Sequence, residues 1–219
     1  MQGVRWPTCV LALALAVAAG VSATASRSAP GPTVTIAAQP SDLLRDRRLT
    51  LYGSISAARP KQIVDLEARD CGQSTWRLVA HVETDVSGRW SWPYFYPGIT
   101  ASIRARWNGT VSTPVLVRDR VFVELRHRGD GDYAVSVRAK RSFQGRRVLF
   151  QRLDPARGWV TVRTVRLTKS GAPPGVSYVY SSARFRAVAP AGALVRAHVP
   201  LGEARPCYLG GRSNFLRLR

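Results

Sequence analysis

Apolar and polar residues alternate with a period of two along most of the chain after residue 32, and helical periodicity is absent there. Successive side chains of a β-strand point to opposite faces, so this pattern predicts strands with one buried and one solvated face. Gly, Pro, Asp and Ser bound the alternating stretches, as expected for turns. The first seven predicted strands are Thr33–Ala38, Arg48–Ile55, Gln62–Arg69, Trp76–Thr84, Arg89–Phe95, Ile99–Trp107 and Thr113–Val117.

A second set of seven strands follows after a short interval. These strands are predicted at Arg120–Arg126, Asp132–Ala139, Arg146–Leu153, Trp159–Thr168, Tyr178–Val188, Ala193–Val199 and Asn214–Leu218. Short strands at regular spacing, with no helices between them, are typical of all-β sandwiches or barrels.

The two sets of strands resemble each other in sequence. The stretch Val64–Arg69 leads to Trp76, and the stretch Val148–Leu153 leads to Trp159, 83 positions further on. A repeat of this length indicates a duplicated domain, because the units of solenoid proteins are shorter. We therefore predict one β-sandwich over residues 33–117 and a second over residues 118–219. No Gly/Ser linker separates them, so we expect the two domains to dock end to end.

The N-terminus has the three parts of a secretory signal peptide. Arg5 is positive, an apolar run of 13 residues extends from Cys9 to Val21, and the small residues Ala23 and Ala25 fit a cleavage site. The run is shorter than the about 20 residues that cross a bilayer. We predict a cleaved signal peptide at 1–25, a linker at 26–32, no transmembrane segment and a secreted or envelope-associated protein. An uncleaved amphipathic or buried helix is the alternative.

Several short motifs resemble those of exported bacterial proteins with tandem Ig-like or fibronectin type III-like repeats, of the actinomycete type. The motifs are a Cys-Gly turn, Trp76 within alternating apolar residues, Gly88–Trp90, Pro97, the pair at 104–105 and the tail at 206–213. The resemblance covers about residues 33–219. It implies two tandem seven-stranded Ig/FnIII-like β-sandwiches and an exported location, and it brings no activity or site residues.

Two cysteines remain once the signal peptide is removed, Cys71 and Cys207. One disulfide is the usual use of two cysteines in an exported chain. If seven strands alternate in direction, Cys71 follows the third strand and lies at the end of the first domain that faces the second. Cys207 follows the sixth strand of the second domain and faces the first. We therefore predict a Cys71–Cys207 disulfide that joins the domains into a rigid spacer; two free thiols or an intermolecular bond are the alternatives.

The chain is strongly basic, with a net charge of +20 from 33 basic residues, and only three of these are Lys. An Arg bias can follow from a GC-rich genome, but the charge still attracts anionic polymers and surfaces. Arginines alternate with apolar residues, as at Arg104 and Arg106 or Arg184 and Arg186, so most should line outer sheet faces. Such faces could bind phosphate-bearing polymers through bidentate contacts.

Signatures of catalysis are absent from the sequence. It has no nucleophile elbow, phosphate loop or zinc-protease motif, and His81, His127 and His198 lack metal-ligand spacing. Asp65 and Glu67 share one face of a strand and could form a carboxylate pair, although a solvated face that neutralises nearby arginines explains them better. We predict no enzyme activity, no catalytic residues, no metal site and no cofactor.

One row of aromatic residues is a candidate ligand-binding surface. Trp90, Trp92, Tyr94 and Tyr96 alternate, so an unbroken strand would point all four to the same face. Pro93 allows an edge strand or a bulge within the row. An exposed row could stack on sugar rings, whereas an inward row would fill the core of the sandwich, and we favour the core.

These features together favour a non-catalytic, secreted or envelope-associated binding or spacer protein. We expect a monomer whose basic faces contact anionic envelope polymers. A carbohydrate-binding module that uses the aromatic row, or a secreted module that binds a protein partner, is the alternative. We expect no nucleic-acid partner, because the aromatic platforms of single-strand binders are not evident.

Overall fold

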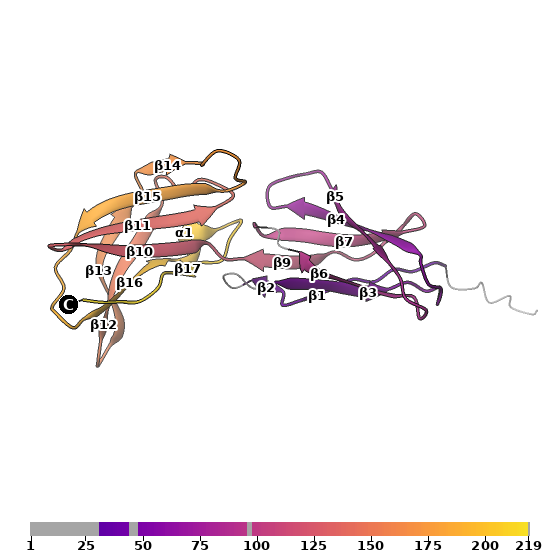
Figure 1. Cartoon of the computed structure of the whole chain (residues 1–219), viewed down its shortest axis with the longest axis horizontal. Helices are drawn as coiled ribbons and strands as arrows, with labels where there is room; N and C mark the ends of the chain where they lie inside the picture. The colour runs from indigo at the N-terminus through magenta and orange to yellow at the C-terminus, as the bar shows by residue number, and fades with distance from the viewer. Residues whose placement is uncertain (1–30, 44–47, 96–97, 219) are drawn as a thin grey trace, which may run out of the picture. The chain divides into compact units, whose positions relative to one another are not determined.

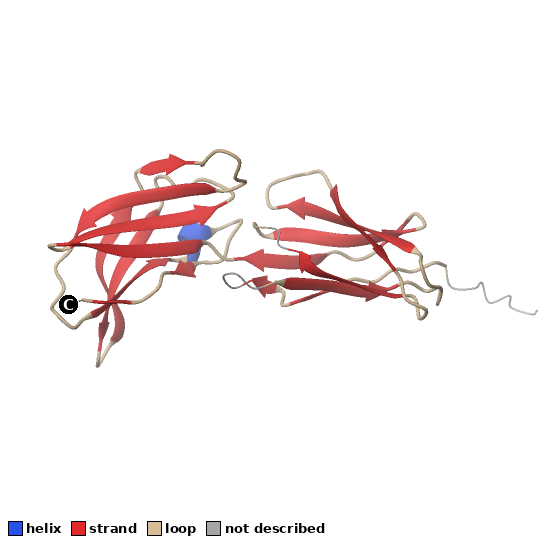
Figure 2. Cartoon of the chain, in the orientation of Figure 1, coloured by secondary structure: helices blue, strands red, loops and turns tan. Residues whose placement is uncertain are grey.

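The structure is a computed structural model, and it describes residues 31–43, 48–95 and 98–218. The predicted signal peptide, most of the predicted linker and Tyr96 lie outside the described residues. The described chain is all-β with one short helix, α1 (Leu201–Ala204) (Figure 2). No helix in these ranges is long and apolar enough to cross a membrane.

Two sheets are built from residues before 120 (Figure 1). The first has the order β1-β3-β6, with β1 at Ala37–Gln39, β3 at Leu49–Ser54 and β6 at Arg89–Phe95. The second has the order β2-β9-β7-β4-β5, with β2 at Asp42–Leu43, β9 at Val115–Asp119, β7 at Ala101–Trp107, β4 at Ile63–Asp70 and β5 at Arg77–Glu83, while β8 (Thr110–Val111) pairs with β7. We call these the N-terminal sheet pair.

Two further sheets follow, which we call the C-terminal sheet pair. One has the order β10-β11-β15-β14, with β10 at Phe122–Gly129, β11 at Asp132–Ala139, β15 at Val179–Arg186 and β14 at Lys169–Gly171. The other has the order β13-β12-β16-β17, with β13 at Gly158–Arg166, β12 at Arg147–Asp154, β16 at Leu194–Val199 and β17 at Gly211–Arg212, while β18 (Leu216–Arg217) pairs with β16. The strands pair antiparallel except β2 and β9, which are parallel.

Each sheet pair encloses its own hydrophobic core, as in a β-sandwich. Leu51, Leu66 and Ile103 lie in the N-terminal core, and Tyr133 and Phe150 lie in the C-terminal core. Burial alternates along the strands: every second residue of β11 is buried from Tyr133 onward. The period-two pattern of the sequence is therefore the pattern of burial, which confirms the all-β prediction.

The strand predictions differ from the structure at several ends. The first predicted strand is reduced to β1, and Val34 forms only an isolated bridge with Ile55. The last strand of the first set extends as β9 through Asp119, past the predicted boundary. The short elements β2, β8, β14, β17 and α1 were not predicted, because segments of two to four residues have too little periodicity to recognise.

The predicted strand Trp159–Thr168 ends early, because the chain changes sheets after Arg166. β13 pairs with β12 up to Arg166, and the chain then crosses to the opposite sheet, where β14 pairs with β15. Leu167, with 1% of its surface exposed, fills the core at the crossing. This change of sheet places Lys169 beside Ser182.

Both sheet pairs repeat the same local details, as the sequence repeat predicts. β5 bulges at Val79, opposite Leu66 and Glu67 of β4, and β13 bulges at Val162, opposite Phe150 and Gln151 of β12. In the first sheet pair the Ala105 N–H donates to the Ser112 hydroxyl at 2.9 Å, and in the second the Ala197 N–H donates to Ser213 at 2.8 Å. The two halves are thus alike in bulge position and in a buried serine contact, beyond their overall strand content.

The predicted disulfide is confirmed: Cys71 and Cys207 are bonded, with their Cα atoms 5.4 Å apart. Cys71 lies in the turn after β4, and Cys207 lies after α1. The Thr100 N–H donates to the Cys207 carbonyl at 3.1 Å. Ile99, with 3% of its surface exposed, belongs to the C-terminal core although it precedes β7. The disulfide therefore links the two sheet pairs at a point where they also share apolar and backbone contacts.

Candidate functional site

The predicted aromatic row does not form a continuous surface. Trp90 lies in the N-terminal core with 4% of its surface exposed, and Trp92 packs half-buried against the same core. Gly53 lies across from Trp90, and a Cβ atom there would come within 2.7 Å of the Trp90 ring. The first two rings of the row therefore fill the core.

The row is also interrupted by a bulge after Pro93. In the pairing of β3 with β6, Leu49 lies opposite Phe95 while Thr50 lies opposite Pro93, so Tyr94 is the additional residue. β6 lies at the edge of its sheet, where a residue without an N–H is tolerated. Period-two alternation is thus lost at Tyr94, for the reason that Pro93 suggested.

Asp65 and Glu67 lie on one face of β4, but arginines on β7 lie directly across from them. Asp65 pairs with Arg106 in register and Glu67 pairs with Arg104. Glu67 Oε2 accepts from Arg104 Nε at 2.7 Å, and Arg106 Nη2 is 3.2 Å from Asp65 Oδ2. His81 Nδ1 lies 2.8 Å from the other Asp65 oxygen. Both carboxylates therefore neutralise neighbouring cations, and we call this surface the paired face.

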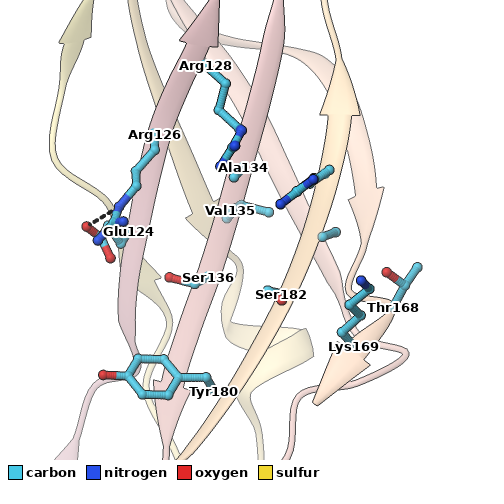
Figure 3. Close-up of a pocket in the computed structure, with 12 residues that line it drawn as sticks. Glu124, Arg126, Arg128, Ala134, Val135, Ser136, Thr168, Lys169, Tyr180 and Ser182 are labelled. Atoms are coloured by element: carbon cyan, nitrogen blue, oxygen red, sulfur yellow. Dashed lines mark hydrogen bonds and ion pairs between the residues drawn. The ribbon is translucent and has the colours of Figure 1, made fainter. Parts of the chain in front are cut away.

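A groove on the outer face of the sheet β10-β11-β15-β14 has the opposite character (Figure 3). Its volume is about 690 Å³. Alternation turns Val123, Leu125, Val135 and Val137 inward to the core, so their neighbours in sequence face the groove. We call this groove the cationic trough; its lining residues are Glu124, Arg126, Arg128, Ala134, Val135, Ser136, Thr168, Lys169, Tyr180, Ser182, Ala183 and Arg184.

Strand register explains the hollow form of the trough. Ala134 of β11 lies between Arg126 of β10 and Arg184 of β15. Two residues further along, Ser136 lies between Glu124 and Ser182, and Ser182 pairs in turn with Lys169 of β14. Small side chains therefore form the floor and long cationic side chains form the two walls, as Figure 3 shows for Arg126 and Lys169.

The cations of the trough outnumber its carboxylates by four to one. Glu124 Oε1 accepts from Arg126 Nε at 2.9 Å, and the Arg126 side chain remains 71% exposed. Within the described residues, no carboxylate lies within ion-pair distance of Arg128, Lys169 or Arg184. Three cations of one groove are thus left to solvent and to a ligand.

Arg138 and Arg186, at the two ends of the same sheet face, already have partners within the protein. The Arg138 guanidinium lies 4.3 Å from the Phe122 ring centre and 5.1 Å from that of Tyr178. Tyr178 in turn packs edge-on against Tyr180, with 5.3 Å between ring centres. At the other end, Arg186 pairs with Asp132 at 2.8 Å. These cations are therefore engaged within the protein, unlike Arg128, Lys169 and Arg184.

Among the residues that the structure describes, a single carboxylate is buried without an arginine partner. Asp119, with 3% of its surface exposed, accepts a hydrogen bond from the Arg120 N–H at 2.8 Å and lines a cavity of about 220 Å³ with Lys140 and Tyr208. Burial raises the pKa of Asp119 to about 6, although the Arg120 N–H and the Lys140 charge act to lower it. Burial likewise raises the pKa of Tyr208 to about 12.

The three histidines do not come together. His81 pairs with Asp65, His127 packs against Tyr133 with 5.0 Å between ring centres, and His198 lies on β16, where burial and then Arg212 and Arg196 lower its pKa. No group of three or more His, Cys, Asp or Glu side chains is placed to hold a metal ion within the described ranges.

Sequence reasoning identified Arg184 as part of an alternating arginine pair but missed Arg126, Arg128 and Lys169. Glu124, Arg126 and Arg128 do alternate with Val123 and Leu125 in the sequence, and this was the available signal. No protein-family model matches the chain, and no curated protein matches it.

Proposed function

We propose that the chain is an exported, non-catalytic binding protein whose cationic trough holds anionic polymers of the cell envelope. The observation that carries this proposal is that Arg128, Lys169 and Arg184, around a groove with a small-residue floor, have no carboxylate partner in the part of the chain that the structure describes. Exposed cations that are concentrated in one concave surface attract polyanions more strongly than the same charges spread over a surface.

The proposal includes two tandem seven-stranded Ig/FnIII-like domains, at 33–117 and 118–219. The repeated bulges at Val79 and Val162 and the repeated serine contacts support a duplication. The Cys71–Cys207 disulfide supports an oxidising compartment, where such bonds persist. A disulfide between the domains would hold the trough at a fixed distance from the rest of the chain, as a spacer requires.

Co-sedimentation with isolated envelope from the source organism tests this function. We expect the purified protein to pellet at low salt and to be released as salt rises, because screening weakens contacts between exposed charges. The variant Arg126→Gln/Arg184→Gln should pellet at least ten-fold less.

The matched control is Arg59→Gln/Arg157→Gln, which removes the same charge from two exposed positions outside the trough. It should pellet like the unaltered protein. Failure of the unaltered protein to pellet at low salt would overturn the proposed function, and equal losses in both variants would show that net charge rather than the trough is responsible.

A further inference from the structure

The donors that line the cationic trough match phosphate better than carboxylate. Three hydroxyl groups, those of Ser136, Thr168 and Ser182, lie among the cations of the trough. None of the three forms a hydrogen bond with another described residue. A phosphate group presents more strong acceptor oxygens than a carboxylate and can use hydroxyl and guanidinium donors together. This donor set therefore suits a ligand with several oxygens on each charged group.

The arginines are placed so that one anionic group can reach two of them. Arg126 and Arg184 lie on either side of Ala134, two strands apart, which is about 10 Å between backbones. Glu124 holds the Nε of Arg126 and leaves its two terminal nitrogens for a ligand. The planar guanidinium binds phosphate oxygens in pairs, which an ammonium group cannot do.

The next row of donors lies further along the same floor. Lys169 and the hydroxyls of Ser136 and Ser182 are displaced from the arginine row by two residues, or about 7 Å along the strands. A ligand with charged groups repeated along a chain would meet both rows. A single small anion would meet only one of them.

The floor of the trough also argues against stacked bases. Tyr180 is the single aromatic residue of the lining, and it lies at one end, packed against Tyr178. Proteins that bind single-stranded nucleic acid place aromatic rings along the path of the strand. A floor of Ala134, Ser136 and Ser182 offers no such platform.

We propose that the cationic trough binds a linear polymer linked or substituted by phosphate groups, laid along β11 between Arg126 and Arg184. This inference rests on the proposed function and specifies its ligand. Glu124 is a positioning residue in this arrangement, because it orients Arg126 and does not itself meet the anion.

Titration of the purified protein with linear inorganic polyphosphate and with polyglutamate of equal charge tests the proposal. We expect polyphosphate to bind at least ten-fold more tightly at physiological salt. Arg126→Gln/Arg184→Gln should weaken polyphosphate binding about 100-fold. It should also make the negative slope of log affinity against log salt less steep, by about one to two. The control Arg59→Gln/Arg157→Gln should change the affinity less than three-fold.

Equal affinity for the two polymers would overturn the phosphate assignment. If trough variants still lose envelope binding in that case, the proposed function stands while its ligand class falls. Tighter binding to vesicles of anionic phospholipid than to polyphosphate, compared per phosphate, would overturn the polymer and assign the trough to a bilayer surface. Tighter binding to single-stranded DNA of equal charge would likewise overturn it.

Discussion

The paired face and the cationic trough are both arginine-bearing outer faces of sheets, yet their arginines are in different states. On the paired face, Arg104 and Arg106 of β7 lie across from Glu67 and Asp65 of β4. In the trough, Arg126 and Arg184 lie across from Ala134 of β11. A carboxylate on the neighbouring strand therefore neutralises each arginine of the paired face, whereas Arg184 faces Ala134 and Arg126, among the described residues, pairs only with Glu124 of its own strand.

The difference between the two faces bears on the origin of the high arginine content. A compositional bias alone would add arginines without regard to their neighbours across the strands. The sheet β1-β3-β6, which occupies the corresponding place in the N-terminal sheet pair, bears Thr50, Tyr52 and Ser54 on the outward positions of its central strand. Its shallow groove includes one arginine, Arg89, and no lysine. Unpaired cations are thus concentrated on one of two corresponding surfaces.

The largest expected effect comes from giving the trough the pairing of the paired face. Ala134→Glu places a carboxylate between Arg126 and Arg184, as Glu67 lies beside Arg104. We expect polyphosphate affinity to fall 100-fold or more, because the carboxylate both neutralises the arginines and repels the ligand. Titration calorimetry measures the affinity.

The neutral variant Ala134→Gln is the control for side-chain size, since it fills the same space without a charge. It should lose less than ten-fold. Unfolding in urea should give nearly the same stability for both variants, because residue 134 is on the outer face and not in the core. An equal loss in both variants would mean that filling the groove, and not pairing its cations, abolishes binding.

The second effect concerns Asp119, a buried carboxylate that has no arginine partner among the described residues. Its pKa of about 6 in the folded protein exceeds the unfolded value of about 3.9. The folded state therefore holds the proton more tightly, so the stability from this group is complete below pH 3.9 and is lost as pH rises through 6. By linkage the loss is about 2–3 kcal/mol.

The variant Asp119→Asn should not show this loss. The difference in unfolding free energy between the variant and the unaltered protein should therefore be about 2–3 kcal/mol more favourable to the variant at pH 7 than at pH 3.5. Urea unfolding across that pH range measures the difference. Asp130→Asn is the control, because Asp130 is exposed in a turn with φ of 48° that Asn also tolerates. Parallel pH curves for the unaltered protein and Asp119→Asn would show that Asp119 titrates normally.

The sequence predicted the features that depend on local pattern and on strand count. Alternation located the main strands, and counting strand directions placed Cys71 and Cys207 at one junction. Pro93 indicated a bulge or an edge strand, and the structure has both. Each of these follows from residues close together in the chain, or from the parity of a strand.

The trough could not be predicted in the same way. Its second wall depends on the pairing of Ala134 with Arg184, which lie 50 positions apart, and on the register between β11 and β15. A slip of one residue would turn Arg184 to the core face. Lys169 reaches the trough only because the chain changes sheets after Arg166. The sequence alone specifies neither the partner strand nor this crossing.

The smallest expected effect comes from removing a carboxylate of the paired face, so that its arginines lose a partner and resemble those of the trough more closely. Glu67→Ala leaves Arg104 and Arg106 without the 2.7 Å and 3.3 Å contacts to Glu67, and Glu67 is itself 7% exposed. We expect a loss of about 2 kcal/mol of unfolding free energy, less than the 3–5 kcal/mol of a fully buried pair because the Arg106 side chain is 47% exposed. Urea unfolding at pH 7 measures it.

Glu67→Gln should cost less than about 1 kcal/mol of unfolding free energy, because the C-terminal sheet pair already contains this arrangement. There Gln151 accepts a hydrogen bond from Arg196 Nε at 2.9 Å. The Arg196 guanidinium lies 4.0 Å from the Trp159 ring centre, as that of Arg104 lies 4.2 Å from the Trp76 ring centre. Glu83→Ala, an exposed change on the neighbouring strand, should change the unfolding free energy by no more than about 0.5 kcal/mol.

Neither Glu67 variant should bind polyphosphate more than three-fold more tightly than the unaltered protein does. The arginines of β7 lie beside Asp65 and His81, and they do not line a groove with a floor of small side chains. A Glu67→Ala protein that bound polyphosphate as tightly as the trough does would show that unpaired arginines suffice, and that the small-residue floor of Ala134, Ser136 and Ser182 contributes nothing to recognition.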